Sequence, residues 1–178
     1  MKKFIAIVLL LLSASVFANW ADVGSFNLGD GSEVSARINP SQNIQINLAH
    51  MTLYFSSVEI DKFLQMIEVN LAMVDAVVNN NTTIVYRKQT DRFIFNGSKI
   101  VSSRFTTNGS GGEDSCFIRI TYIDQTFYPL TDNSVLFSAQ ELRELVSLIN
   151  QARGTSNNMG EQIRFLEEAY RENRRLGI

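Results

Sequence analysis

The chain contains a single cysteine and a single histidine among its 178 residues. Because Cys116 has no second cysteine to pair with, no internal disulfide bond can form, and the fold must depend on its hydrophobic core. Catalysis by a Ser-His-Asp or Cys-His arrangement needs a histidine base. His50 stands in a short reversal between two predicted strands, and no Gly-x-Ser-x-Gly motif accompanies it. We therefore interpret His50 as a surface turn residue.

Motifs that hold a metal or a nucleotide are also lacking. One histidine and one cysteine do not supply the ligands of a usual zinc site, and the acidic residues at 30–33 and 113–114 do not follow an EF-hand pattern. The glycine-rich segment 108–112 lacks the Lys-Ser/Thr ending of a P-loop and the G-x-G-x-x-G order of a dinucleotide fold. We therefore expect no cofactor and no metal ion. A carboxylate-based hydrolase stays open as an alternative, because catalytic carboxylates are adjacent only in space.

The beginning of the chain has the layout of a secretory signal peptide. A basic Met1-Lys2-Lys3 start precedes an apolar run at 4–12, and small residues then lead up to Ala18. The run is too short to span a bilayer, which takes about 20 apolar residues. We predict cleavage after Ala18, a periplasmic or secreted location of bacterial type, and no transmembrane segment after cleavage. An uncleaved anchor is the open alternative.

Cleavage after Ala18 would leave 160 of the 178 residues (178 − 18), enough for one domain with a sizeable core. Loss of Lys2 and Lys3 would lower the basic count from 16 to 14 against 18 acidic residues, so the net charge would change from −2 to −4. A mildly acidic chain has no overall field that attracts nucleic acid or an anionic membrane. This balance disfavours nucleic acid as a ligand.

Two segments of the chain, 53–63 and 135–145, resemble each other. Each reads as a short apolar strand that ends in Phe-Ser and is followed by a helix start. In each, the serine and a glutamate three residues later fit a capping box, in which both side chains bond free amides at the helix start. The two serines, Ser56 and Ser138, lie 82 residues apart (138 − 56). These features predict a duplicated unit.

The same offset aligns residues upstream of the two serines. It places the strand-like segment 34–38 on 116–120 and the segment 44–48 on 126–130. Glycine-containing turn segments precede the aligned strands in both copies, as hairpins require. The offset therefore predicts that the two copies share their strands as well as their caps.

Runs of strands followed by a helix favour an α+β fold with antiparallel sheets. We expect two pseudo-repeated antiparallel strand-rich units, each followed by an amphipathic helix, and a further C-terminal helix. Residues 19–153 are predicted to form one duplicated domain, with copies at 19–78 and 82–153, and residues 154–178 a flexible loop and a helix. Strands are predicted at 20–28, 33–39, 43–48, 51–55, 83–88, 92–95, 99–107, 115–123, 126–130 and 134–137, and helices at 57–78, 139–153 and 161–175.

Basic and aromatic residues are interleaved through the strands of the second copy, and such sets can stack bases and track phosphates. A unit of four strands, a serine cap and an amphipathic helix, used twice, resembles the Whirly and Pur-alpha group of single-strand nucleic-acid-binding folds. The resemblance covers most of the chain after residue 18 and depends on element order, and no binding motif of those families is present. The candidate nucleic-acid-binding residues are Tyr86, Arg87, Lys88, Arg92, Phe93, Lys99, Arg104 and Arg119.

The predicted last helix carries an apolar stripe that either docks on its own sheet or forms an arm that binds a second subunit or another protein. Arginines crowd its C-terminal end, where cations suit the helix dipole. The candidate partner-binding residues are Met159, Ile163, Phe165, Leu166 and Tyr170.

These observations favour an exported, non-enzymatic binding or assembly module. The expected partner is a protein or another component of the cell envelope, and a homo-oligomer is a further expectation. Two alternatives stay open: a single-stranded nucleic-acid-binding protein that uses the basic-aromatic sheet, and the carboxylate-based hydrolase.

Overall fold

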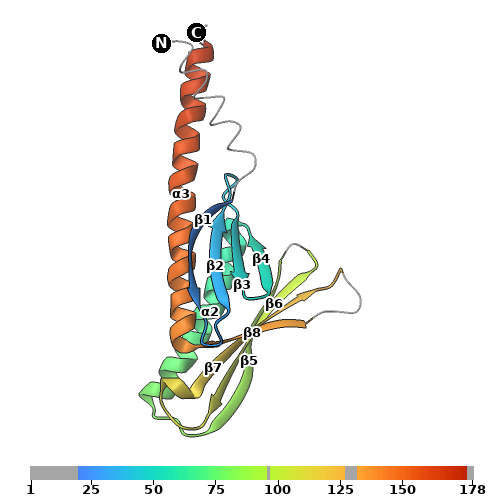
Figure 1. Cartoon of the computed structure of the whole chain (residues 1–178), viewed down its shortest axis with the longest axis vertical. Coiled ribbons are helices and arrows are strands. Elements are labelled where there is room, and N and C mark those ends of the chain that lie inside the picture. Colours follow the sequence, from blue (N-terminus) through green and yellow to red (C-terminus); the bar gives the residue numbers. More distant parts are fainter. Residues whose placement is uncertain (1–19, 96, 127–131, 176–178) are drawn as a thin grey trace.

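The structure is a computed structural model, and it describes residues 20–95, 97–126 and 132–175. The protein has the predicted α+β fold, with two four-stranded antiparallel sheets and two long helices (Figure 1). The predicted signal peptide lies outside the described residues. The first sheet, in the order β1-β2-β3-β4, and the helix after it consist of β1 (Ala21–Asn27), β2 (Glu33–Ile38), β3 (Ile44–Leu48), β4 (Met51–Phe55) and α2 (Ser57–Asn79).

The second half repeats this order. Its sheet runs β5-β6-β7-β8 and is followed by the longest helix of the described chain, α3. The elements are β5 (Val85–Phe95), β6 (Lys99–Asn108), the 3-10 turn η1 (Glu113–Ser115), β7 (Cys116–Asp124), β8 (Asp132–Ser138) and α3 (Ala139–Arg175).

Both predicted capping boxes are confirmed. The Ser56 hydroxyl accepts a hydrogen bond from the Glu59 amide, and the Glu59 carboxylate accepts one from the Ser56 amide at 2.9 Å. At the start of α3, the Glu141 carboxylate accepts a bond from the Ser138 amide at 2.6 Å. Glu141 also accepts a bond from the Gly29 amide at 2.6 Å, so this cap ties α3 to the β1–β2 turn.

Each helix packs largely against the sheet of the other half. Helix α2 follows the first sheet but extends from β4 onto β5 and β6, and α3 follows the second sheet but runs along β1 and β2. The side chains between them form one hydrophobic core. Phe55 joins the halves within this core, because its ring stacks on Phe63 at 4.9 Å and lies 5.3 Å from Phe95. Neither half can bury its inner surface without the other.

A buried polar cluster fixes α2 on the second sheet. The Asn70 side chain is fully buried; its amide nitrogen donates to the Ser103 hydroxyl at 2.9 Å, and its oxygen accepts from the Thr90 hydroxyl at 2.8 Å. Thr90 lies at the irregularity between Gln89 and Asp91, where β5 carries one extra residue. Since a buried polar group without a partner costs about 1–3 kcal/mol, this cluster favours one register of α2 on the sheet.

The predicted strand map needs two corrections in the second half. The predicted strands at 83–88 and 92–95 are one strand, β5, because the extra residue near Thr90 bends the strand without ending it. The predicted repeat offset of 82 residues is also wrong upstream of β8. Ile118 of β7 pairs in register with Phe137, as Ile44 of β3 pairs with Phe55, so β7 corresponds to β3 at an offset of 74 residues (118 − 44). The predicted strand at 126–130 lies mostly outside the described residues.

The predicted loop at 154–160 is also wrong, because α3 is one continuous helix of 37 residues. Glycines at 154 and 160 lower helix propensity, but the side chains of Ala152 and Ser156 are buried against the core on either side of Gly154. Packing of the helix on the first sheet therefore outweighs the propensity of single residues. Within the described residues, neither helix has the length and apolar character that a membrane span requires.

We expect Gly154→Ala to raise the free energy of unfolding by about 0.5–1 kcal/mol, because alanine loses less backbone entropy than glycine in a helix. An added methyl group at Gly154 meets no atom within 4 Å. Urea unfolding followed by circular dichroism measures the change.

Gly160→Ala is the matched control. A methyl group at this position would lie 1.9 Å from Nε2 of Gln42, the end of an exposed and flexible side chain that must move, so the gain should be slightly smaller. A loss of stability at Gly154 would contradict the packing of α3 described above.

Glu141 gives α3 a dependence on pH. Burial acts to raise the pKa of Glu141, but the hydrogen bonds from Ser138 and Gly29 outweigh it and hold this pKa below its usual range. A lowered pKa in the folded state means that the stabilisation is present at neutral pH and is lost as the pH falls through that pKa.

We expect Glu141→Gln to cost about 1 kcal/mol at neutral pH, the size of a helix cap, and the cost to shrink in acid. Thermal unfolding between neutral pH and strong acid measures this difference. Glu144→Gln, one turn further along α3, is the control and should change little. If the loss of stability in Glu141→Gln were the same at every pH, it would contradict the hydrogen bonds from Ser138 and Gly29 to the Glu141 carboxylate.

Candidate functional site: the outer face of the second sheet

The pleat of the second sheet separates its arginines from most of its aromatic residues. Successive side chains of a strand point to opposite faces. Ser103 and Phe105 on β6 are buried on the inner face, so Arg104 between them points outward. The same alternation directs Arg119 outward, between the buried Ile118 and Ile120 of β7.

The strand register groups four arginines on the outer face. Outward residues form rows that cross the sheet from β5 to β8, and three of these rows contain the four arginines together with serine and threonine residues. We name the surface formed by Arg87, Arg92, Arg104 and Arg119 the arginine face. The rows are Arg87–Thr106–Phe117–Ser138, Gln89–Arg104–Arg119–Leu136 and Arg92–Ser102–Thr121–Ser134.

Two of these arginines are direct cross-strand neighbours. Arg104 and Arg119 pair in the register of β6 and β7, and the Arg119 guanidinium donates a hydrogen bond to the Ser134 hydroxyl at 3.0 Å. Like charges placed directly opposite each other destabilise a sheet. The fold therefore tolerates repulsion between these two arginines. Such a loss of stability is more typical of a binding surface than of a surface that stabilises the fold.

Within the described part of the chain, none of the ion pairs involves the arginine face; the cations that form them are Arg37, Arg143, Arg153 and Arg171. Asp91 is the nearest acidic residue along β5, but it pairs in register with the inward-facing Ser103 and accepts a bond from the Arg92 amide at 2.7 Å. The positive charge of the arginine face is therefore concentrated on one open surface.

The other four residues predicted for nucleic-acid binding lie elsewhere. Tyr86, Lys88 and Phe93 occupy inward positions of β5, in register with Thr107, Phe105 and Val101, and Phe93 packs against the core. Lys99 lies at the end of β6 beside Asp124; hydrogen bonds from Thr126, with the charge of Lys99, lower the pKa of this carboxyl. Phe117, which is half-buried, is the one aromatic residue in the described rows of the outer face.

The outer face of the first sheet has a different chemistry. Its arginine, Arg37, is bonded to Asp22 at 2.6 Å. The side chain of Asn47 accepts a hydrogen bond from Gln45 at 2.8 Å and donates one to Ser35 at 3.0 Å. The two pseudo-repeated sheets therefore share their pairing pattern, while a network of amides and hydroxyls replaces the arginines on the first one.

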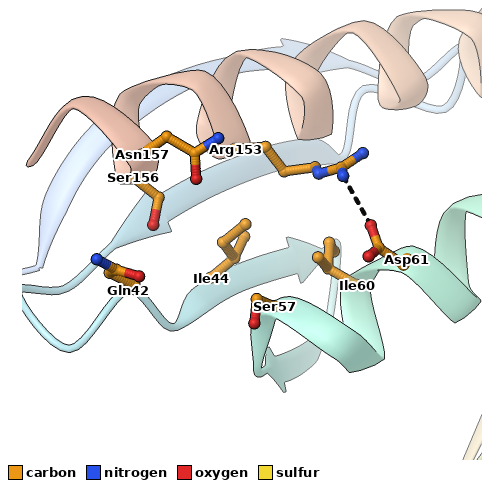
Figure 2. A pocket seen from close by; sticks show the side chains of 8 residues that line it. All are labelled: Gln42, Ile44, Ser57, Ile60, Asp61, Arg153, Ser156 and Asn157. Atoms are coloured by element: carbon orange, nitrogen blue, oxygen red, sulfur yellow. Dashed lines mark ion pairs between the residues drawn. The ribbon is translucent and has the colours of Figure 1, made fainter. Parts of the chain in front are cut away.

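Among the described residues, three hollows lie away from the arginine face, and one of them, of about 500 Å³, is an open hollow beside Arg37, Asn47 and His50 on the first sheet. Figure 2 shows a cavity of about 90 Å³ between β3, α2 and α3, where Arg153 of α3 reaches Asp61 of α2 at 2.8 Å. This space suits a few water molecules and is smaller than a usual ligand pocket, which takes about 300 Å³ or more. An apolar groove of about 310 Å³ runs between the end of α2 and β5, and Tyr86 and Ile84 line it.

The structure places the residues that could carry catalytic or metal chemistry apart from the arginine face. No group of three or more His, Cys, Asp or Glu side chains gathers within the described residues. Cys116 lies in the core, and burial raises the pKa of its thiol, so it has the environment of a small apolar side chain. His50 is exposed in the β3–β4 turn, as predicted.

The residues predicted for partner binding lie at the far end of α3. Met159 packs against the core, whereas α3 continues past the first sheet beyond it (Figure 1). Phe165, Leu166 and Tyr170 are exposed to 69%, 43% and 62%, and Ile163 is half-buried. The stripe therefore docks on its own sheet only as far as Met159, and the rest forms a projecting helix.

Comparison with protein-family models, with curated proteins and with solved structures finds no match to this chain. The resemblance to the Whirly and Pur-alpha group stays a prediction from element order.

Proposed function

We propose that the protein is a non-enzymatic binding module that holds a flexible, phosphate-bearing polymer on the arginine face. The observation that carries this proposal is the gathering of four arginines on one sheet surface, none of which takes part in the ion pairs found among the described residues. A pair of like charges, Arg104 with Arg119, lies near its centre. A bound anion would relieve the repulsion between them.

The chemistry of the surface suits phosphate groups. A guanidinium group is planar and donates two parallel hydrogen bonds to one phosphate, so several arginines fix both position and orientation. The hydroxyls of Ser102, Thr106 and Thr121 lie in the rows between the arginines and add neutral donors. The surface spans strands β5 to β7 and is not enclosed, which suits an extended chain more than a small molecule.

The same surface favours contact with phosphates over contact with bases. Base stacking needs exposed aromatic platforms. Tyr86 is 40% exposed, but Tyr86 and Phe93 lie on the side of β5 opposite the arginine face, and Phe117 on that face is half-buried. With the predicted export signal, the natural ligand would be a phosphate-bearing polymer of the cell envelope. Single-stranded nucleic acid shares the backbone chemistry, and the resemblance to the Whirly and Pur-alpha group supports it as a second source.

Fluorescence polarisation with a labelled oligothymidylate, and with inorganic polyphosphate as competitor, tests the proposal. We expect binding at low salt. The logarithm of the binding constant should fall linearly with the logarithm of the salt concentration, and the steepness of this line should decrease by about 0.7 for each arginine removed. Substitution of Arg87, Arg92, Arg104 and Arg119 by glutamine should abolish binding. Arg37→Gln, on the equivalent outer face of the first sheet, should leave binding unchanged.

The outcomes distinguish a phosphate polymer from single-stranded nucleic acid as the ligand, and they also show whether the arginine face binds neither. Full competition by polyphosphate means that a phosphate chain is sufficient, as proposed. Oligonucleotide binding that polyphosphate cannot displace would mean that bases are recognised, and the phosphate-polymer proposal would be wrong. The absence of binding to either probe at low salt, or equal binding by the quadruple variant, would also overturn it.

The paired arginines predict opposite effects on stability and binding. Arg104→Gln should raise the free energy of unfolding by about 0.2–1 kcal/mol at low ionic strength, because it removes a like-charge cross-strand pair. Salt should reduce this gain, since screening weakens the repulsion. The same variant should bind the polymer more weakly.

Urea unfolding at low and high salt measures this gain. Arg37→Gln is the control with the opposite sign, because it removes an attractive pair with Asp22 and should cost 0 to about 1 kcal/mol. A loss of stability on Arg104→Gln would show that this arginine stabilises the fold.

A further inference from the structure

The stripe of α3, apolar except for Ser156, continues from the core onto the projecting part of the helix. Its members alternate at spacings of three and four residues, which is the pattern of a coiled-coil seam. The first five are buried against the protein's own sheets, and Met159 is partly buried. The stripe consists of Leu142, Leu145, Ile149, Ala152, Ser156, Met159, Ile163, Leu166 and Tyr170.

The last fifteen described residues of this helix, 161–175, extend beyond the first sheet (Figure 1), and we name them the arm. At 1.5 Å per residue the arm is about 22 Å long. A helix of this length is marginal in water unless an apolar face is packed. Leu166 and Tyr170 on the stripe are nevertheless exposed to 43% and 62%, so the arm presents a helix surface that still needs an occupant.

The charges of the arm are divided between its two halves. The half nearer the sheet carries Glu161, Arg164, Glu167 and Glu168, a net charge of −2, and the outer half carries Arg171, Glu172, Arg174 and Arg175, a net charge of +2. Two such arms in antiparallel orientation place each acidic half against a basic half. In parallel orientation they place like charges together.

We infer that the occupant is a second copy of the chain, bound arm to arm in antiparallel orientation about a two-fold axis. The seam that already packs α3 onto its own core would continue between the two arms, through Ile163, Leu166 and Tyr170. A two-fold contact uses the same patch on both copies, and the self-complementary charge pattern of the arm meets this condition. Antiparallel arms also keep the two sheet bodies at opposite ends.

The contact area sets the strength of the pair. Two arms about 22 Å long bury less than a standard stable interface of about 1,600 Å², so the pair should be weak and should depend on concentration. Dimerisation would also place two arginine faces in one particle, and linked sites bind a polymer more tightly than single ones. This last consequence rests on the proposed function, whereas the pairing of arms does not.

Sedimentation velocity over a range of protein concentrations, without any polymer, tests the inference. We expect a monomer–dimer equilibrium in the unmodified protein, and a monomer at all concentrations when Ile163 and Leu166 are both changed to serine. Phe165→Ser is the matched control: Phe165 is 69% exposed on the same arm but lies off the stripe. It should dimerise like the unmodified protein.

Disulfide capture tests the orientation. Ile163→Cys mixed with Asn173→Cys should give a cross-linked dimer under mild oxidation, because position 173 continues the spacing of the stripe and antiparallel arms bring it against position 163 of the other copy. Asn173→Cys alone should give little, because antiparallel arms keep the two 173 positions apart. The thiol of Cys116 is buried, so cross-linking of the protein that carries this cysteine alone measures the background.

Three results would overturn the inference: a monomer at every concentration, equal disruption by Phe165→Ser, or efficient cross-linking of Asn173→Cys alone. Failure of polymer binding would leave all three readouts unaffected, so the inference and the proposed function fail separately.

Discussion

The exchange of helices between the two sheets is the constraint on which the rest of the structure depends. Helix α2 leaves the first sheet and covers β5 and β6, while α3 leaves the second sheet and covers β1 and β2. The buried contact of Phe55 with Phe95 and the bonded side chains of Asn70, Thr90 and Ser103 hold this arrangement in place. Both inner faces are used for the common core, and the outer faces of the two sheets lie outside it.

The two outer faces have diverged while the strand pairing has stayed the same. On the first sheet, the charge of Arg37 is neutralised by Asp22. On the second, Arg104 and Arg119 are held side by side by the register of β6 and β7. The exchange also accounts for the arm, since α3 must run along the whole first sheet and still continues past its edge (Figure 1). A binding surface and a projecting helix therefore follow from one packing arrangement.

Local signals in the sequence predict much of this fold, and long-range register explains what they miss. Ser56 and Ser138 mark both helix starts, because a capping box lies within four residues of the chain. The fixed repeat offset fails upstream of β8, because the chain from Ile118 to its register partner Phe137 is eight residues longer than the chain from Ile44 to Phe55 (19 − 11). The helix through Gly154 depends on packing by residues distant in sequence. The arginine face likewise depends on pairing across three strands and on the extra residue near Thr90 in β5.

The most direct test of the proposed role of the arginine face is a nuclear magnetic resonance titration of the labelled protein with inorganic polyphosphate. The account predicts that the shifted signals, both backbone amides and arginine Nε–H groups, cluster at Arg87, Arg92, Arg104 and Arg119 on β5, β6 and β7. Signals from β1 to β4, including Arg37, should stay unchanged. Shifts that concentrate on the first sheet, or that spread evenly over all surface cations, would contradict it.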